Sequence, residues 1–137
     1  MDDKKLSPGF EDYLEAIYII KKNKGIVRVK GIAHYLKISF PSVTEAIRKL
    51  AKKKLVVYEK YGYIDLTKKG ESIAKTVYSK HKILLKFLTK VLDIDKESAF
   101  YEACIMEHGL SKKTMNKLIN FVNSYLKLKN KVILKGK

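Results

Sequence analysis

The chain has 137 residues and one cysteine, and its 30 lysines and arginines against 14 aspartates and glutamates give a net charge of +16. The length allows one domain or two small ones, and the lone cysteine excludes an internal disulfide. The sequence has no run of roughly eighteen apolar residues and no apolar leader, so nothing in it indicates a membrane or secreted protein. We therefore expect a cytoplasmic protein whose positive charge binds a polyanion, most simply nucleic acid.

The charge favours contact with phosphates over the reading of bases, because Arg28 and Arg48 are the only arginines and bidentate recognition of guanine is mainly an arginine property. Residues 1–70 and residues 71–137 each carry a net charge of +8. Charge alone therefore does not locate the interface. The order of the predicted elements indicates it instead.

Three helices are predicted in the first seventy residues. An apolar stripe indicates a helix over residues 8–22, which Gly25 then stops. A short second helix is predicted over residues 29–36. Residues 38–42 supply a tight turn with a polar cap and a proline in the first turn of a third helix. A helix, a short turn and another helix are typical of a DNA-binding helix-turn-helix.

A hairpin is predicted directly after these helices. Residues 55–59 and 63–66 are β-rich and flank a basic, aromatic tip. Three helices and a hairpin make a winged helix-turn-helix, whose third helix enters the major groove of DNA. The alternative is a helical domain with an incidental hairpin. The residues predicted to contact DNA are Ser39, Pro41, Ser42, Thr44, Glu45, Arg48, Lys52, Lys60 and Tyr61.

The rest of the chain predicts only helices. A long amphipathic helix follows the hairpin, and Asp95 and Ser111 cap a fifth and a sixth helix. Their apolar faces need the first domain or a second subunit to cover them, and the basic tail, residues 127–137, is expected to be frayed. We divide the chain into a winged helix-turn-helix domain, residues 1–70, and a helical domain, residues 71–137.

Cys104, Glu107 and His108 lie at positions i, i+3 and i+4, which share one face of a helix. A thiol, a carboxylate and an imidazole within one turn can form a metal site, or they can be an accident of composition. His81 lies on the apolar stripe of the long helix. Its spacing alone favours a core histidine bonded to a backbone carbonyl over a metal ligand.

Asp12 and Glu15 stand three residues apart on the first helix, roughly opposite its apolar stripe. A solvated acidic edge would explain them. Against that explanation, Ile19 shares their face, and an apolar residue there indicates burial against something outside the domain's own core. The helical domain is the expected partner of this face.

Five segments, residues 11–18, 41–44, 66–70, 80–81 and 102–111, together resemble the diphtheria toxin repressor family of metal-dependent transcriptional regulators. They follow one another in the family's order with short gaps between them. The length resembles the short manganese transport regulator-like branch, which lacks the C-terminal SH3-like domain. The resemblance implies a mostly α fold, with an N-terminal winged helix-turn-helix followed by an all-helical metal-binding and dimerisation domain.

The resemblance also implies a ligand set. Cys104 departs from the manganese regulators, which have a glutamate there, whereas Asp12 departs from the iron regulators, which have a methionine. Hard oxygen ligands favour manganese, and a thiolate favours iron, cobalt, nickel or zinc, so Fe(II) or Mn(II) is the expected metal. The ancillary site of the iron regulators is not expected, because its positions fall on Leu85 and Phe100. The implied ligands are Asp12, Glu15, His81, Cys104, Glu107 and His108.

The predicted function is a metal-dependent repressor of metal-homeostasis genes that binds a double-stranded DNA operator as a homodimer, with no membrane, no organic cofactor and no catalytic residues. One alternative is a metal-independent winged-helix regulator in which Cys104, His81 and His108 are packing residues. Another is a small metalloenzyme. The enzyme is disfavoured because the sequence has no HExxH motif, no Ser-His-Asp context and no Gly-rich phosphate loop.

Overall fold

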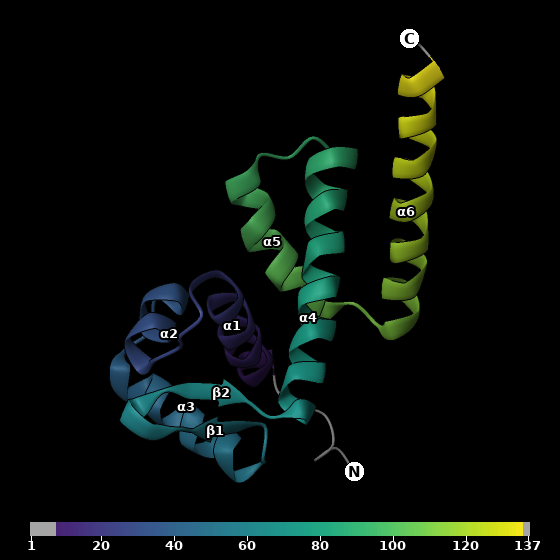
Figure 1. The fold of residues 1–137 in the computed structure, drawn as a ribbon. Coiled ribbons are helices and arrows are strands. Elements are labelled where there is room, and N and C mark those ends of the chain that lie inside the picture. The colour runs from purple at the N-terminus through teal and green to yellow at the C-terminus, as the bar shows by residue number, and fades with distance from the viewer. Residues whose placement is uncertain (1–7, 136–137) are drawn as a thin grey trace. The chain divides into compact units, whose positions relative to one another are not determined.

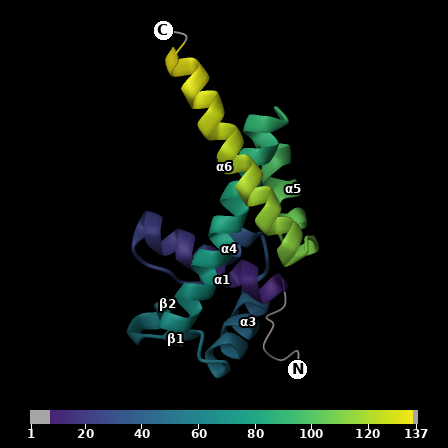
Figure 2. The ribbon, with the colours of Figure 1, turned by 90° about the vertical axis from the view of Figure 1, so that its right-hand side faces the viewer.

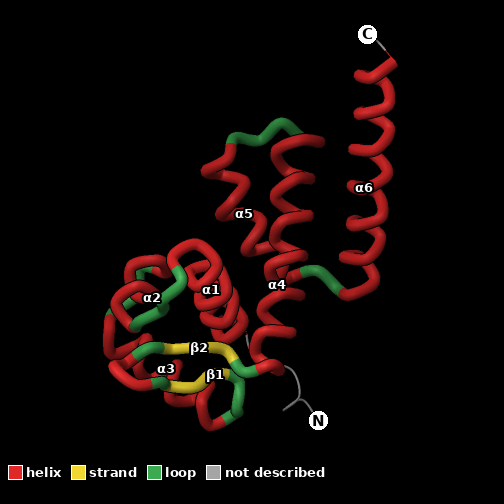
Figure 3. The backbone as a smooth tube through the Cα atoms, in the orientation of Figure 1, coloured by secondary structure: helices red, strands yellow, loops and turns green. Residues whose placement is uncertain are grey.

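The computed structural model describes residues 8–135, with side chains described over residues 9–130. This part of the chain forms helices and one two-stranded hairpin (Figures 1 and 3), which confirms the mostly α fold. Two compact units meet at Val77 and Tyr78. Helix α4 (Lys68–Lys86) runs through residue 70 without a break, and the domain boundary placed there stays a prediction.

The first unit opens with the three expected helices, α1 (Pro8–Lys24), α2 (Val29–Leu36) and α3 (Phe40–Lys52). Helix α1 is two residues longer than predicted. It ends where Gly25 adopts a φ of 81°, a left-handed conformation that glycine takes without steric cost. The predicted helix-turn-helix is therefore present.

The turn before α3 has the predicted cap. The Ser39 side chain accepts a hydrogen bond from the backbone N–H of Ser42 at 3.3 Å, which satisfies one of the free donors at the helix start. Pro41 lies in the first turn, where its missing N–H costs nothing. The sequence thus sets the start of the predicted recognition helix.

The hairpin consists of β1 (Val56–Tyr58) and β2 (Ile64–Leu66), paired antiparallel with Val57 opposite Asp65. Each strand is slightly shorter than predicted. The tip is a tight turn over Lys60–Gly62 in which Tyr61 and Gly62 both have positive φ. This hairpin is the expected wing.

One hydrophobic core holds the first unit together. It lies between the three helices and the hairpin, and it also takes in Ile73 and Ala74 from the start of α4. Burying side chains of this size contributes roughly 1.5–3 kcal/mol each. Its largest fully buried members are Leu14, Ile17, Val27, Ile32, Val43, Ile47, Leu50 and Val56.

The second unit is helical. The end of α4 passes into a π-helical turn, η3 (Phe87–Val91), which α5 (Lys96–Gly109) and α6 (Lys112–Lys135) follow (Figure 2). The predicted caps are confirmed, because Asp95 accepts from the N–H of Ser98 at 2.9 Å and Ser111 accepts from the N–H of Thr114 at 3.1 Å. The core of this unit consists of Leu84, Leu88, Ala99, Ala103 and Met115.

The expectation of a frayed tail is wrong for residues 127–135, because α6 continues to Lys135. Tyr125 and Leu126 are half-buried and residues 127–130 are exposed, so the helix continues beyond these packed side chains. Among the helices of the described residues, none is long and apolar enough to cross a membrane.

Candidate metal centre and nucleic-acid interface

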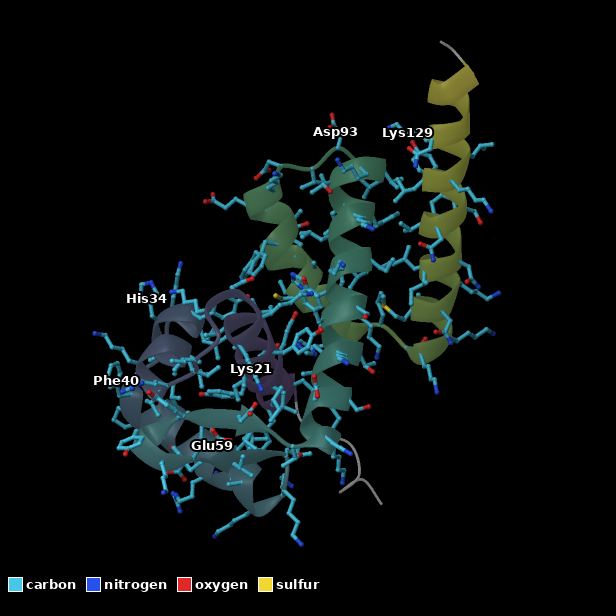
Figure 4. The ribbon with its side chains drawn as sticks, viewed as in Figure 1. Lys21, His34, Phe40, Glu59, Asp93 and Lys129 are labelled. Atoms are coloured by element: carbon cyan, nitrogen blue, oxygen red, sulfur yellow. The ribbon has the colours of Figure 1, made fainter. Side chains whose placement is uncertain are left out.

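The side chains predicted to contact DNA all lie at the surface of the first unit. They come from α3, from its cap and from the wing. Phe40, which begins α3 (Figure 4), is also 53% exposed although it is a large apolar residue. The exposed predicted residues are Ser39, Pro41, Ser42, Thr44, Glu45, Arg48, Lys52, Lys60 and Tyr61.

An ion-pair cluster restrains the basic side chains of α3. Glu45 Oε1 lies 3.1 Å from the Arg48 guanidinium, and Glu45 Oε2 lies 3.7 Å from Lys49 Nζ. All three side chains are more than half exposed, so these pairs contribute at most about 1 kcal/mol. Glu45 can therefore orient Arg48 without preventing it from bonding to a phosphate.

The wing presents an exposed aromatic tip. Tyr61 is 82% exposed, and its ring lies 6.4 Å from that of Tyr63. On Tyr63 the guanidinium of Arg28 stacks at 4.6 Å from the ring centroid, a cation–π contact that joins the start of α2 to the wing. No local sequence pattern predicts this contact, although Arg28 is one of only two arginines in the chain.

Lys21 and Asp65 join α1 to the wing, with Lys21 Nζ donating to Asp65 Oδ1 at 2.6 Å. Partial burial raises the pKa of Asp65, but hydrogen bonds from Lys21 and from the Leu66 N–H outweigh it and hold that pKa below its usual 3.8. The same bond to Asp65 raises the pKa of Lys21 above its usual value. Both shifts favour the charged pair.

Three predicted metal ligands meet in the second unit. His81 on α4 lies with its Nδ1 atom 3.3 Å from Oε1 of Glu107 and 3.8 Å from Sγ of Cys104, both on α5. His81 is 5% exposed and Glu107 is 8% exposed. The ring of Phe100 contacts the imidazole edge-on at 5.0 Å between centroids, and the sequence reasoning gave Phe100 no such role.

The donor set of this cluster fits a divalent cation. Oε2 of Glu107 is buried and has no hydrogen-bond partner among the described residues. Leaving a buried carboxylate oxygen unsatisfied costs about 1–3 kcal/mol or more, and a cation would remove that cost. In the part of the chain that the structure describes, no group of three or more His, Cys, Asp or Glu side chains is already arranged to hold a metal ion.

The other predicted ligands have different positions. His108 follows Glu107 on α5 and is half-buried. Asp12 and Glu15 lie one turn apart on α1, in the first unit. Glu15 is only 8% exposed and Asp12 is half-buried, so Glu15 is not part of a solvated acidic edge.

Two family models match the chain one after the other. The iron dependent repressor N-terminal DNA binding domain matches residues 5–64. The iron dependent repressor metal binding and dimerisation domain matches residues 67–127. Together they cover most of the sequence, and each match falls on the part of the fold expected to carry that role.

Individual relatives agree with these matches. The HTH-type transcriptional regulator MntR of Bacillus subtilis is 34% identical over 119 residues, which are 87% of this chain and 83% of the relative. MntR of Lysinibacillus sphaericus is 36% identical over 116 residues, which are 85% of this chain and 83% of the relative. An uncharacterized HTH-type regulator of Methanocaldococcus jannaschii is 39% identical over 121 residues, with 88% and 97% covered.

Solved structures share the fold. The manganese regulator SloR has a TM-score of 0.75 at 33% identity, with 86% of this chain and 55% of that chain covered. The IdeR protein of T. acidophilum also has a TM-score of 0.75, at 26% identity, with 82% and 53% covered. The chain thus spans about half the length of these two regulators. With both domain models matched in sequence order, the chain belongs to the iron-dependent repressor family of metal-dependent transcriptional regulators.

Proposed function

We propose that the chain represses metal-homeostasis genes in the cytoplasm, and that it binds a double-stranded DNA operator as a homodimer when Fe(II) or Mn(II) is abundant. The observation that carries this proposal is the buried contact of His81 with Glu107 and Cys104, in the domain that matches the metal-binding model. The exposed face of α3 and the wing supply the DNA-binding surface of the same chain.

The proposed site would hold the metal with oxygen, nitrogen and sulfur donors. A divalent metal, when bound, would supply positive charge beside the buried carboxylate of Glu107, whose Oε2 atom has no hydrogen-bond partner among the described residues. A neutral imidazole and a thiolate would complete a mixed donor set, which suits Fe(II) as well as Mn(II). We infer from the family resemblance that the ligands are Asp12, Glu15, His81, Cys104, Glu107 and His108.

This division of the ligands explains how metal could control DNA binding. Asp12 and Glu15 belong to the unit that carries α3, and the other four residues belong to the unit that matches the dimerisation domain. Metal binding by these residues would thereby be coupled to DNA binding by the two recognition helices of a homodimer. The role of the metal is then regulatory.

DNA binding in the presence of metal or chelator tests the proposal. Under anaerobic conditions, Mn(II) or Fe(II) should raise affinity for a duplex from the protein's own promoter at least about fivefold over the chelated protein. Equal affinity in both conditions would support the metal-independent winged-helix alternative and overturn the proposed switch.

Two variants on α5 test the ligand set directly. Glu107→Gln should weaken metal binding about 10- to 100-fold, whereas the same change at the exposed Glu102 is the matched control and should leave it unchanged. Titration calorimetry with Mn(II) on the full chain measures both. If the two variants bind Mn(II) equally well, Glu107 is a buried residue without a ligand role.

Cys104 is the position where the chain leaves the manganese pattern. A ligating thiolate should give a sulfur-to-metal charge-transfer band with Co(II), and Cys104→Ala should abolish that band. Cys104→Glu should raise the response to Mn(II) relative to Co(II), because it replaces a soft ligand by a hard one. Should the Co(II) spectrum be the same in Cys104→Ala, the cysteine is a half-buried packing residue without a ligand role.

A further inference from the structure

Helix α6 carries a strong and one-sided charge. After Glu107 the sequence contains no aspartate or glutamate and eight lysines, seven of them within Lys112–Lys135, the span of α6. All five acidic residues of the second unit lie between residues 93 and 107. The excess charge of this unit is therefore concentrated on one helix about 36 Å long.

Five lysines of α6 with described side chains face solvent, and none of the five has an acidic partner among the described residues. Lys113, Lys117 and Lys127 are exposed, as are Lys112 and Lys129, the last of which is labelled in Figure 4. The ion pairs found among the described residues involve lysines of the other helices and none of these five. Mutual neutralisation by salt bridges therefore does not explain this surface.

Three of these lysines share one face. Lys113, Lys117 and Lys127 follow the spacing i, i+4 and i+14, so they lie in a row along the helix. This row is opposite Val122, which is fully buried. Like charges four residues apart destabilise a helix, as at Lys113 and Lys117. A row that destabilises its own helix and has no internal partner indicates an external polyanion.

We propose that this row of lysines on α6 is a second, sequence-independent DNA-binding surface, separate from α3 and the wing. It rests on the proposed function in that it takes DNA to be the partner. Lysine suits the role because its ammonium contacts phosphates as a point charge and does not read bases bidentately. The row extends over about 21 Å of helix, enough to follow several phosphates.

DNA fits this row better than a lipid surface does. Between Lys117 and Lys127 the row is continued by Asn120 and Ser124, so no apolar side chain lies within it. A helix in a membrane interface instead inserts its apolar face between flanking lysines. The centre of the apolar face of α6, which includes Met115 and Val122, is already buried in the protein, and the exposed apolar residues Phe121 and Leu128 lie beside the lysine row and not within it.

The test compares salt dependence in two charge-matched variants of the Mn(II)-loaded full chain. The variant K113Q/K117Q/K127Q should lower affinity for a promoter duplex and for a random duplex by the same factor. It should also reduce the log–log slope of affinity against salt by up to about 0.9 per lost contact. The control K86Q/K90Q/K96Q removes the same charge from exposed sites of the same unit and should leave the slope unchanged.

Further arms separate the possible outcomes. The variant K113R/K117R/K127R keeps the charge and should keep the slope, and equal thermal melting of all variants excludes unfolding as the cause. Equal slopes in the glutamine variant and in its control overturn the proposal. The proposal is also overturned if the glutamine variant no longer sediments with phosphatidylserine vesicles while the salt slope of its DNA affinity is unchanged. A wild-type chain that ignores metal would overturn the proposed switch, while the comparison of slopes would still decide the role of α6.

Discussion

Gly70, in the first turn of α4, is the position where the structure predicts the sharpest effect of a small substitution. A Cβ atom at Gly70 would lie 2.0 Å from the carbonyl oxygen of Leu55 and 3.0 Å from its carbonyl carbon. Ordinary van der Waals contact begins at 3.4 Å. The first turn of α4 must therefore retreat by about 1.4 Å, the difference between 3.4 and 2.0 Å, because a backbone atom has no rotamer to change.

That retreat breaks the hydrogen bonds which hold α4 to the turn before β1. The Thr67 N–H donates to the Leu55 carbonyl at 3.1 Å, and the Thr67 hydroxyl donates to the Lys54 carbonyl at 2.8 Å. The two lost hydrogen bonds cost about 1 kcal/mol each, and an unsatisfied carbonyl costs about 1–3 kcal/mol. This loss exceeds the roughly 1 kcal/mol by which alanine stabilises a helix over glycine. We expect Gly70→Ala to lower the free energy of unfolding by about 2–4 kcal/mol.

Urea unfolding of the full chain measures this effect, at one protein concentration and with chelator present, because bound metal and dimerisation both shift apparent stability. Gly31→Ala is the matched control. Gly31 lies inside α2, and a Cβ there meets nothing within 4 Å, so the substitution should raise stability by up to about 1 kcal/mol. If Gly70→Ala has the same urea midpoint and slope as the wild type, the steric reasoning is wrong.

Two further predictions concern the wing and its support. The pKa of Asp65 is lowered in the folded state. The difference in unfolding free energy between wild type and Asp65→Asn should therefore be constant above about pH 5 and should decline as the pH falls through 3.8. Urea unfolding across this range measures the difference, and a difference that persisted at pH 2 would contradict the prediction. For DNA binding, Lys60→Ala should lower the affinity for promoter and random duplexes by the same factor, whereas Ser42→Ala should change the preference between the two duplexes. A Lys60→Ala effect confined to the promoter duplex in a binding titration would reverse these two roles.

Local chemistry made most of the fold predictable. Apolar periodicity placed the helices, and short polar side chains such as Ser39, Asp95 and Ser111 marked where helices begin. These are signals that a stretch of four to seven residues carries by itself. The end of α6 was not predicted in this way, because Lys127 and Lys129 made the segment look solvated, whereas the helix continues to Lys135 although residues 127–130 are exposed.

Contacts between distant segments could not be predicted from the sequence pattern and are known only from the structure. The approach of Gly70 to Leu55 and the stacking of Arg28 on Tyr63 join residues that no local pattern relates. Helical spacing could place Cys104 and Glu107 on one face of α5, but it could not place His81 beside them, since 23 and 26 residues separate it from these two. Here the family resemblance supplied the grouping that periodicity could not.

The burial of polar groups supports the proposed metal site independently of that resemblance. Among the described residues, the polar or charged side chains that are buried are Glu15, His81 and Glu107, and all three belong to the proposed ligand set. Burying a charged side chain is costly unless it is paired and hydrogen-bonded, and Glu107 is paired with His81 at 3.3 Å through only one of its two carboxylate oxygens. A regulatory cation beside the His81–Glu107 pair would satisfy the second carboxylate oxygen of Glu107, which a metal-independent packing role leaves without a hydrogen-bond partner among the described residues.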